Sequence, residues 1–381
     1  MANVLTNLAA DIYKAADVVG RELVGFIPAS TINANGSDRV AKGDTVRASF
    51  TRAATATNVS ESMTIPEGTD QTVDSKTLSI SKARAVQIPY TGEDVRHLNN
   101  GIGFDTVYGD QIVQAMRTLV NEIESDLAVE AYKNASRAFG TAGTTPFGSN
   151  FSEIAEIRQI LADNGCPMND GQISLVLGTL AGTNLRQLAQ LQKANEAGGD
   201  SLLRQGILLD LQGLGIRESA QIQSHTKGTG SSYLVNDASA AIGDTTIAAD
   251  GGSGTIVAGD IVTINGDSNK YVVNTALAGG SFVIGGPGLR VAVADNAAIT
   301  VGNDYTANVA FHRRALELAV RAPAVPEGGD AADDAMIVQD PHSGLVFEVR
   351  VYRGYRKSMI EVASAWGVKA WKSDFIANLL G

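Results

Sequence analysis

The segment from residue 53 to residue 90 sets the strongest limit on the fold of this chain. Its first half, AATATNVSESMTIPEGTDQ, is rich in Thr and Ser and cannot bury enough apolar surface to fold by itself. Its second half, KTLSISKARAVQI, alternates in polarity as a strand does. One face of that strand would carry Leu78, Ile80, Lys82, Arg84, Val86 and Ile88. We therefore predict a long two-stranded loop turning near residues 65–70, with a plain surface loop as the alternative.

The strongest helical signal lies between residues 105 and 139. Apolar residues recur there at spacings of three and four, while most acidic residues occupy other faces. The apolar stripe consists of Ile112, Met116, Leu119, Ile123, Leu127 and Ala131. Asp105 is a candidate N-cap. A helix of about 30 residues is ~45 Å long, so we expect it to span a whole domain as a spine.

The other segments alternate between helical and strand patterns. Residues 3–26 have the spacing of an amphipathic helix, and residues 28–36 hold the Pro, Asn and Gly that end helices. A strand is expected within residues 42–51. From 150 to 224, helices such as LRQLAQLQKA (185–194) alternate with short strands, which is typical of an α+β domain.

Residues 225–307 change to short β segments separated by Gly-rich turns. The chain holds 41 Gly in 381 residues, about 11% against a usual ~7%, and much of the excess lies in this block. We predict a small β-barrel or sandwich inserted into an α+β host. Residues 308–323 return to a mixed α/β pattern, followed by a Pro/Gly/Asp-rich loop (322–336) and an antiparallel hairpin (345–371).

Charge and cysteine content exclude several classes of protein. The net charge of −11 disfavours attraction of the whole surface to DNA, although a local basic face can exist. A single cysteine, Cys166, cannot form an intramolecular disulfide, and no Cys/His spacing resembles a zinc site. The first residues lack the pattern of a signal peptide, and no run of about 18 apolar residues could span a membrane.

No catalytic or cofactor motif stands out. The histidines (His97, His225, His312 and His342) have no metal-binding spacing and are interpreted as structural or solvated, and Cys166 as an ordinary thiol. The glycine motifs GLGIRE (213–218) and GTIVAGD (254–260) are interpreted as turns, because one lacks its third glycine and the other has Asp260 where a phosphate loop needs lysine. Asp333 and Asp334 are expected in a solvated loop. We predict no enzyme activity, no metal and no cofactor.

Four stretches carry a resemblance to a known family. They are LLRQGILLDLQGLGIRESAQI (202–222), GDIVTING (259–266), NVAFHRRALELAVRAP (308–323) and, more weakly, VRVYRGY (349–355). Together with the order of elements, they resemble tailed-phage major capsid proteins of the Hong Kong 97 fold. The inserted β block narrows the resemblance to the group typified by phage P-twenty-two, whose added module is called the I-domain.

The resemblance implies an α+β capsid fold with an N-terminal arm, an extended β loop, a spine helix, A- and P-type domains and an inserted small β-barrel. The implied boundaries are 1–52 for the arm and first strand, 53–90 for the extended loop, 91–224 for the spine and first part of the core, 225–307 for the I-domain, and 308–381 for the rest of the core.

The implied function is structural. Hexamers and pentamers of the chain would form the icosahedral head of a bacteriophage around double-stranded DNA, through a procapsid built on a separate scaffolding protein, with a portal protein at one vertex. The shell would assemble in the bacterial cytoplasm, become part of the virion and involve no membrane. Implied inter-subunit contacts are Ile65, Pro66, Glu67, Lys82 and Arg84, and implied scaffold contacts are Asp11, Asp17 and Glu22.

Two other functions stay open from the residues alone. The β-rich block also suits a different virion part, such as a tail-tube or decoration protein, and an enzyme with an unrecognised site is the third possibility. The C-terminal region has a basic excess that could face nucleic acid or an acidic partner. It consists of Arg350, Arg353, Arg356, Lys357, Lys369 and Lys372.

Overall fold

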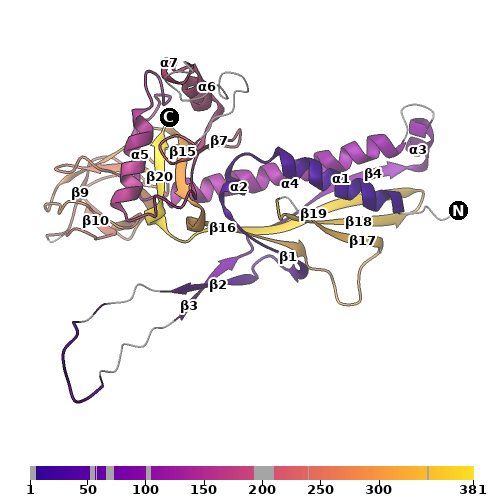
Figure 1. The fold of residues 1–381 in the computed structure, drawn as a ribbon, viewed down its shortest axis with the longest axis horizontal. Coiled ribbons are helices and arrows are strands. Elements are labelled where there is room, and N and C mark those ends of the chain that lie inside the picture. Colours follow the sequence, from indigo (N-terminus) through magenta and orange to yellow (C-terminus); the bar gives the residue numbers. More distant parts are fainter. Residues whose placement is uncertain are drawn as a thin grey trace.

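Helix α4 (Phe104–Lys133), 30 residues long, runs along the molecule and connects its two halves (Figure 1). The computed structural model describes residues 6–51, 56, 58–65, 73–99, 104–192, 210–238, 240–340 and 343–381. One half is an elongated sheet covered by helices, and the other holds a second sheet that continues into a β-barrel. The predicted spine helix is confirmed, with Asp105 one residue inside the helix rather than before it.

The elongated half is built on a six-stranded sheet. Its strands, in order, are β1 (Thr31–Val40), β16 (Leu316–Pro323), β19 (Lys357–Ala370), β18 (Val346–Gly354) and β17 (Ala332–Gln339), and β4 (Lys82–Thr91) also pairs with β19. β1 runs parallel to β16, and the other pairs are antiparallel. The predicted C-terminal hairpin is β18–β19. A short helix, α3 (Gly92–Asn99), follows β4.

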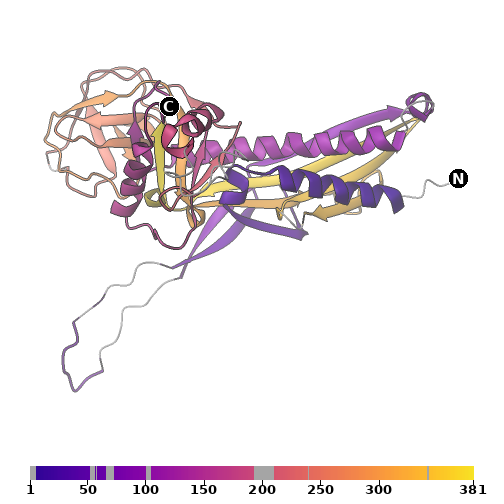
Figure 2. The ribbon, with the colours of Figure 1, turned by 45° about the horizontal axis from the view of Figure 1, so that its top comes forward.

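Helices α1 (Thr6–Glu22) and α4 pack side by side against this sheet (Figure 2). Every residue of the predicted apolar stripe on α4 is at most 1% exposed. From α1, Ile12, Ala15 and Val19 join the same core. The periodicity therefore identified the buried faces of both helices, although α1 ends at Glu22 and Phe26 belongs to the separate helix α2 (Phe26–Ala29).

The second half combines α+β layers with the β-rich block. Its central strands are β5 (Arg137–Gly140), β20 (Ile376–Leu380), β15 (Tyr305–His312), β6 (Ile173–Leu177), β7 (Gly215–Glu218) and β8 (Ser224–His225). Helix α5 (Ser152–Asp163) packs on β5 and β20. The helix expected over 185–194 is instead the pair α6 (Thr179–Gln187) and α7 (Ala189–Gln192), divided at Leu188.

The β-rich block forms a closed barrel, called the inserted barrel below. Its strands are β9 (Tyr233–Val235), β10 (Thr246–Asp250), β11 (Ile261–Ile264), β12 (Lys270–Ala278), β13 (Ser281–Ile284) and β14 (Ala298–Val301). They pair in the ring β11–β14–β9–β10–β13–β12, which closes because β12 returns to β11. A separate core including Val262, Tyr271 and Phe282 fills it. β12 also pairs with β5, so the barrel continues the host sheet.

The predicted extended loop exists, but its strands differ from those expected. β2 (Thr45–Thr51) pairs antiparallel with β3 (Val73–Ser79), and this ribbon projects from the body (Figure 1). The stretch 76–88 is not one strand, because Leu78 and Ile80, each 1% exposed, pack against Ala319 and Ala365 at the ribbon's base. The chain then enters the sheet as β4. The turn expected at 65–70 lies largely outside the described residues.

Three further expectations were wrong for one reason, namely that pairing to a neighbouring strand overrode local composition. Residues 28–36 were expected only to end the first helix, but residues 31–40 form β1, where the Asn33 amide donates to Glu317 across the sheet at 3.0 Å. Residues 308–323 contain β15 and β16 with one 3-10 turn between them, and no α-helix. Asp333 and Asp334, expected in a loop, lie on β17.

Glu124 fixes the start of the chain to the spine helix. Its side chain, 7% exposed, accepts the backbone N–H of Phe26 at 2.5 Å and of Ile27 at 3.0 Å, so it caps α2 from a distant part of the sequence. A Cβ on residue 25 would overlap this carboxylate, which explains Gly25. Burial raises the pKa of Glu124 above its ordinary value.

We expect Glu124→Gln to lower the free energy of unfolding by about 1–3 kcal/mol at pH 7, because one buried N–H loses its acceptor. The folded-state pKa lies above the unfolded one, so the folded protein binds this proton more tightly and the contribution of Glu124 grows as pH falls from 7. The loss should therefore be larger at pH 5. Urea unfolding of both proteins at the two pH values measures it, and a smaller loss at pH 5 would contradict the assignment.

Candidate assembly surfaces

The described end of the β2–β3 ribbon exposes apolar side chains to solvent. Val59, Met63 and Ile65 are 102%, 106% and 92% exposed, within seven residues of one another. Residues 58–65 lie at the far end of the projection (Figure 1). Apolar groups that cluster in water mark interaction surfaces, because burying them against another molecule is favourable.

The predicted inter-subunit residues separate into two groups. Ile65 lies on this exposed end, and Pro66 and Glu67 lie outside the described residues. Lys82 and Arg84 lie on β4 and face α4, where they pair with Asp126 at 2.7 Å and Glu122 at 3.4 Å. The structure thus gives Lys82 and Arg84 partners within the chain, and their role between subunits stays a prediction.

The predicted scaffold contacts all fall on α1. Asp17 is partly exposed there, next to the exposed Tyr13, whereas the side chains of Asp11 and Glu22 lie outside the described part. Their contact with a scaffolding protein also stays a prediction.

A buried polar cluster joins the inserted barrel to the host. His225 at the barrel's entry, 5% exposed, bonds the fully buried Asp260 at 2.8 Å. Asp260 also accepts the N–H groups of Gly228 at 3.0 Å and Val257 at 2.8 Å. The Tyr305 hydroxyl, at the barrel's exit, donates to the carbonyl of Gly259 at 2.7 Å. The polar groups of residues 254–260 therefore bond within this cluster. This agrees with the interpretation of GTIVAGD as a turn rather than a phosphate loop.

His312 likewise has a structural role, since Nε2 lies 2.7 Å from Asp170 and Nδ1 accepts the N–H of Arg314. The side chain of His97 and all of His342 lie outside the described part. Among the described residues, no group of His, Cys, Asp and Glu is arranged to hold a metal ion. No helix in that part is long and apolar enough to cross a membrane.

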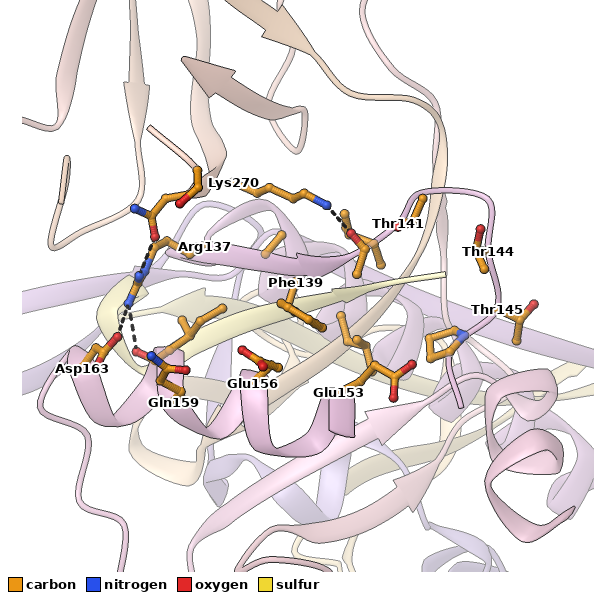
Figure 3. Close-up of a pocket in the computed structure, with 18 residues that line it drawn as sticks. Arg137, Phe139, Thr141, Thr144, Thr145, Glu153, Glu156, Gln159, Asp163 and Lys270 are labelled. Atoms are coloured by element: carbon orange, nitrogen blue, oxygen red, sulfur yellow. Dashed lines mark hydrogen bonds and ion pairs between the residues drawn. The ribbon is translucent and has the colours of Figure 1, made fainter. Parts of the chain in front are cut away.

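A cavity of about 530 Å³ lies where α5, β5 and the β11–β12 turn meet (Figure 3). Arg137, 6% exposed, crosses it by donating to Asn269 at 2.9 Å and to the carbonyl of Ile160 at 3.4 Å. Lys270 donates to the carbonyl of Gly140. The sequence reasoning missed this site, because a lone arginine on a short strand carries no pattern. These bonds attach the barrel to α5, and the lining contains no nucleophile paired with a base.

Comparisons with known proteins identify the fold. No protein-family model matches the chain, and no curated protein does. The capsid structure of cyanophage P-SCSP1u is similar with a TM-score of 0.51 and 10% identity, covering 94% of this chain and 88% of the other. Weaker likenesses include a Mycobacterium phage Che8 structure (TM-score 0.47, 14% identity, 89% and 85% covered) and a Pyrococcus furiosus virus-like particle (0.44, 9%, 97% and 98%).

The fold is similar to that of a phage capsid structure. In particular, the chain has the Hong Kong 97 fold of tailed-phage capsid proteins, in which the spine helix, the extended loop and the two sheets occur together. The resemblance inferred from sequence is thereby confirmed for the fold.

The polar cluster at the barrel entry should be essential for stability. We expect Asp260→Asn to lower the free energy of unfolding by about 2–4 kcal/mol, because the amide presents N–H groups to backbone donors and loses the His225 pair. Asp250→Asn, at an exposed position of β10, is the control and should stay within about 0.5 kcal/mol of wild type. Differential unfolding in urea measures both. Equal effects of the two substitutions would show that the cluster has no special role.

Cys166 should be inert in the folded protein. Its side chain is 6% exposed, and burial raises the pKa of the thiol to about 12, so almost no thiolate exists at neutral pH. We expect a disulfide reagent at pH 8 to react at least about 100-fold more slowly with the native chain than with the chain in urea. Comparable rates in both states would contradict the buried placement.

Proposed function

We propose that this chain is the major capsid protein of a tailed bacteriophage, many copies of which form a closed icosahedral shell around double-stranded DNA. The exposed apolar end of the ribbon carries the proposal. A projecting segment that makes no contact with its own body is stabilised by lying on a neighbouring copy, so folding of the ribbon and assembly support each other. The capsid fold supports the same conclusion.

The finer parts of the proposal follow from the resemblance to tailed-phage major capsid proteins. Copies form hexamers and pentamers in the bacterial cytoplasm, a separate scaffolding protein guides them through the acidic residues of α1, and a portal protein occupies one vertex of the virion. The net charge of −11 suits a container that does not bind its DNA strongly. A tail-tube or decoration role is less well supported, because the likeness at TM-score 0.51 is to a capsid.

Expression of the chain, alone and together with the genes that flank its own, tests the proposal. Electron microscopy should show closed shells of uniform size. Persistent monomers under all these conditions, or helical tubes, would overturn it.

The ribbon's apolar end should be necessary for assembly and unnecessary for the fold. We expect Val59→Ser/Met63→Ser/Ile65→Ser to leave the free energy of unfolding within about 0.5 kcal/mol of wild type, since the three side chains are solvated in the free chain. The same variant should lose closed shells, because those side chains then have no apolar surface to bury against a neighbour. Circular dichroism in urea measures the first property and electron microscopy the second.

The matched control is Val24→Ser/Leu180→Ser/Ile242→Ser, which removes three apolar side chains that are 55%, 63% and 67% exposed but scattered over the body. Shells should persist in this variant. Shells that survive in the ribbon variant would contradict the proposed role of the ribbon.

A further inference from the structure

The turn of the β18–β19 hairpin is an exposed basic projection, called the basic tip below (residues 353–357). Arg353, Arg356 and Lys357 are all exposed, and Tyr355 is 92% exposed. Arg356 has φ of +55°, a conformation that disfavours residues other than glycine. The exposed ring of Tyr355 is available for contact with another molecule.

The basic tip borders a hollow and contains charges without a partner. The hollow, about 710 Å³ in volume, is walled by Tyr90, Thr91 and Glu93 on one side and by the tip on the other. Arg353 is paired with Asp333 at 2.7 Å. In the described chain, Arg356 and Lys357 have no carboxylate within ion-pair distance.

A second segment next to the tip is acidic, called the acidic loop below (residues 327–334). It comprises the end of the connection from β16 and the first three residues of β17, the edge strand of the sheet. β17 pairs with β18 so that Asp334 lies opposite Val351 (Figure 1). Asp330 forms an ion pair with Arg350 and Asp333 forms one with Arg353, each at 2.7 Å. Glu327 and Asp334 are exposed and have no cationic partner among the described residues.

Among the described residues, the basic tip and the acidic loop thus present unpaired charges of opposite sign. We propose that the basic tip of one copy contacts the acidic loop of a second copy, with Arg356 and Lys357 facing Glu327 and Asp334. Each copy carries both the basic tip and the acidic loop. Every subunit can therefore contact one neighbour through its tip and another through its loop, as a closed assembly of identical chains requires. A nucleic acid fits less well, because the neighbouring carboxylates repel phosphate.

This inference rests on the proposed capsid function, and charge reversal tests it separately. Three variants are needed: Arg356→Glu/Lys357→Glu, Glu327→Lys/Asp334→Lys, and the combination of all four. Each double variant places like charges across the contact and should reduce the yield of closed shells at least ten-fold. The fourfold variant restores opposite charges and keeps the net charge of the wild type, so its yield should return to within about two-fold of wild type.

The outcomes separate the two proposals. Absence of shells from the wild type would overturn the proposed function, whatever the variants do. Shells from the wild type and from both double variants would overturn only the contact proposed here. Failure of the fourfold variant to recover, with its fold intact by circular dichroism, would also overturn it. If only the basic double variant is defective and it packages less DNA, the tip faces nucleic acid instead.

Discussion

The burial of one face of α4 is the interaction on which the rest of the structure depends. Its stripe packs against α1, the elongated sheet and the sheet that leads into the barrel, so a single helix fixes both halves of the chain. Polar groups on α4 then set the positions of the neighbours. Asp126 accepts both Lys82 of β4 at 2.7 Å and the indole of Trp366 at 2.8 Å, and Glu124 holds α2.

The body buries its apolar side chains in cores of its own, whereas the described end of the ribbon leaves its apolar side chains exposed. Leu78 and Ile80 fasten the ribbon's base, but beyond them β2 and β3 pair only with each other. A lone two-stranded ribbon is marginally stable in water. Its exposed apolar end adds surface that the chain cannot cover, so the free energy available from the ribbon is released only when a second molecule covers it. In the proposed function, that second molecule is a neighbouring copy of the chain.

Periodicity predicted much of this fold, and tertiary pairing explains what it missed. The stripe on α4 and the barrel's short strands were identified because each segment repeats its own pattern. The strand β1 was missed, since Asn33 and Gly36 disfavour strands locally and only β16 supplies the pairing. The boundary between β3 and β4 near Ile80 was missed because the alternation of apolar and polar residues continues across it. For the candidate surfaces, Ile65 was named because of the family resemblance and its contact stays a prediction, whereas the partners of Lys82 and the role of Arg137 depend on contacts between distant segments.

Ion pairing within the chain also changes the meaning of the C-terminal basic excess. Arg350 is 8% exposed and lies between Glu348 and Asp330, at 3.3 and 2.7 Å, so it neutralises the sheet's own acids rather than facing a partner. Arg356 and Lys357 of the tip, by contrast, are exposed and have no carboxylate partner among the described residues. Exposed ion pairs contribute little free energy individually, while buried apolar area contributes most of it. An assembly that takes its strength from the ribbon and its alignment from charges at the tip can reject misplaced neighbours, because a wrong register brings like charges together.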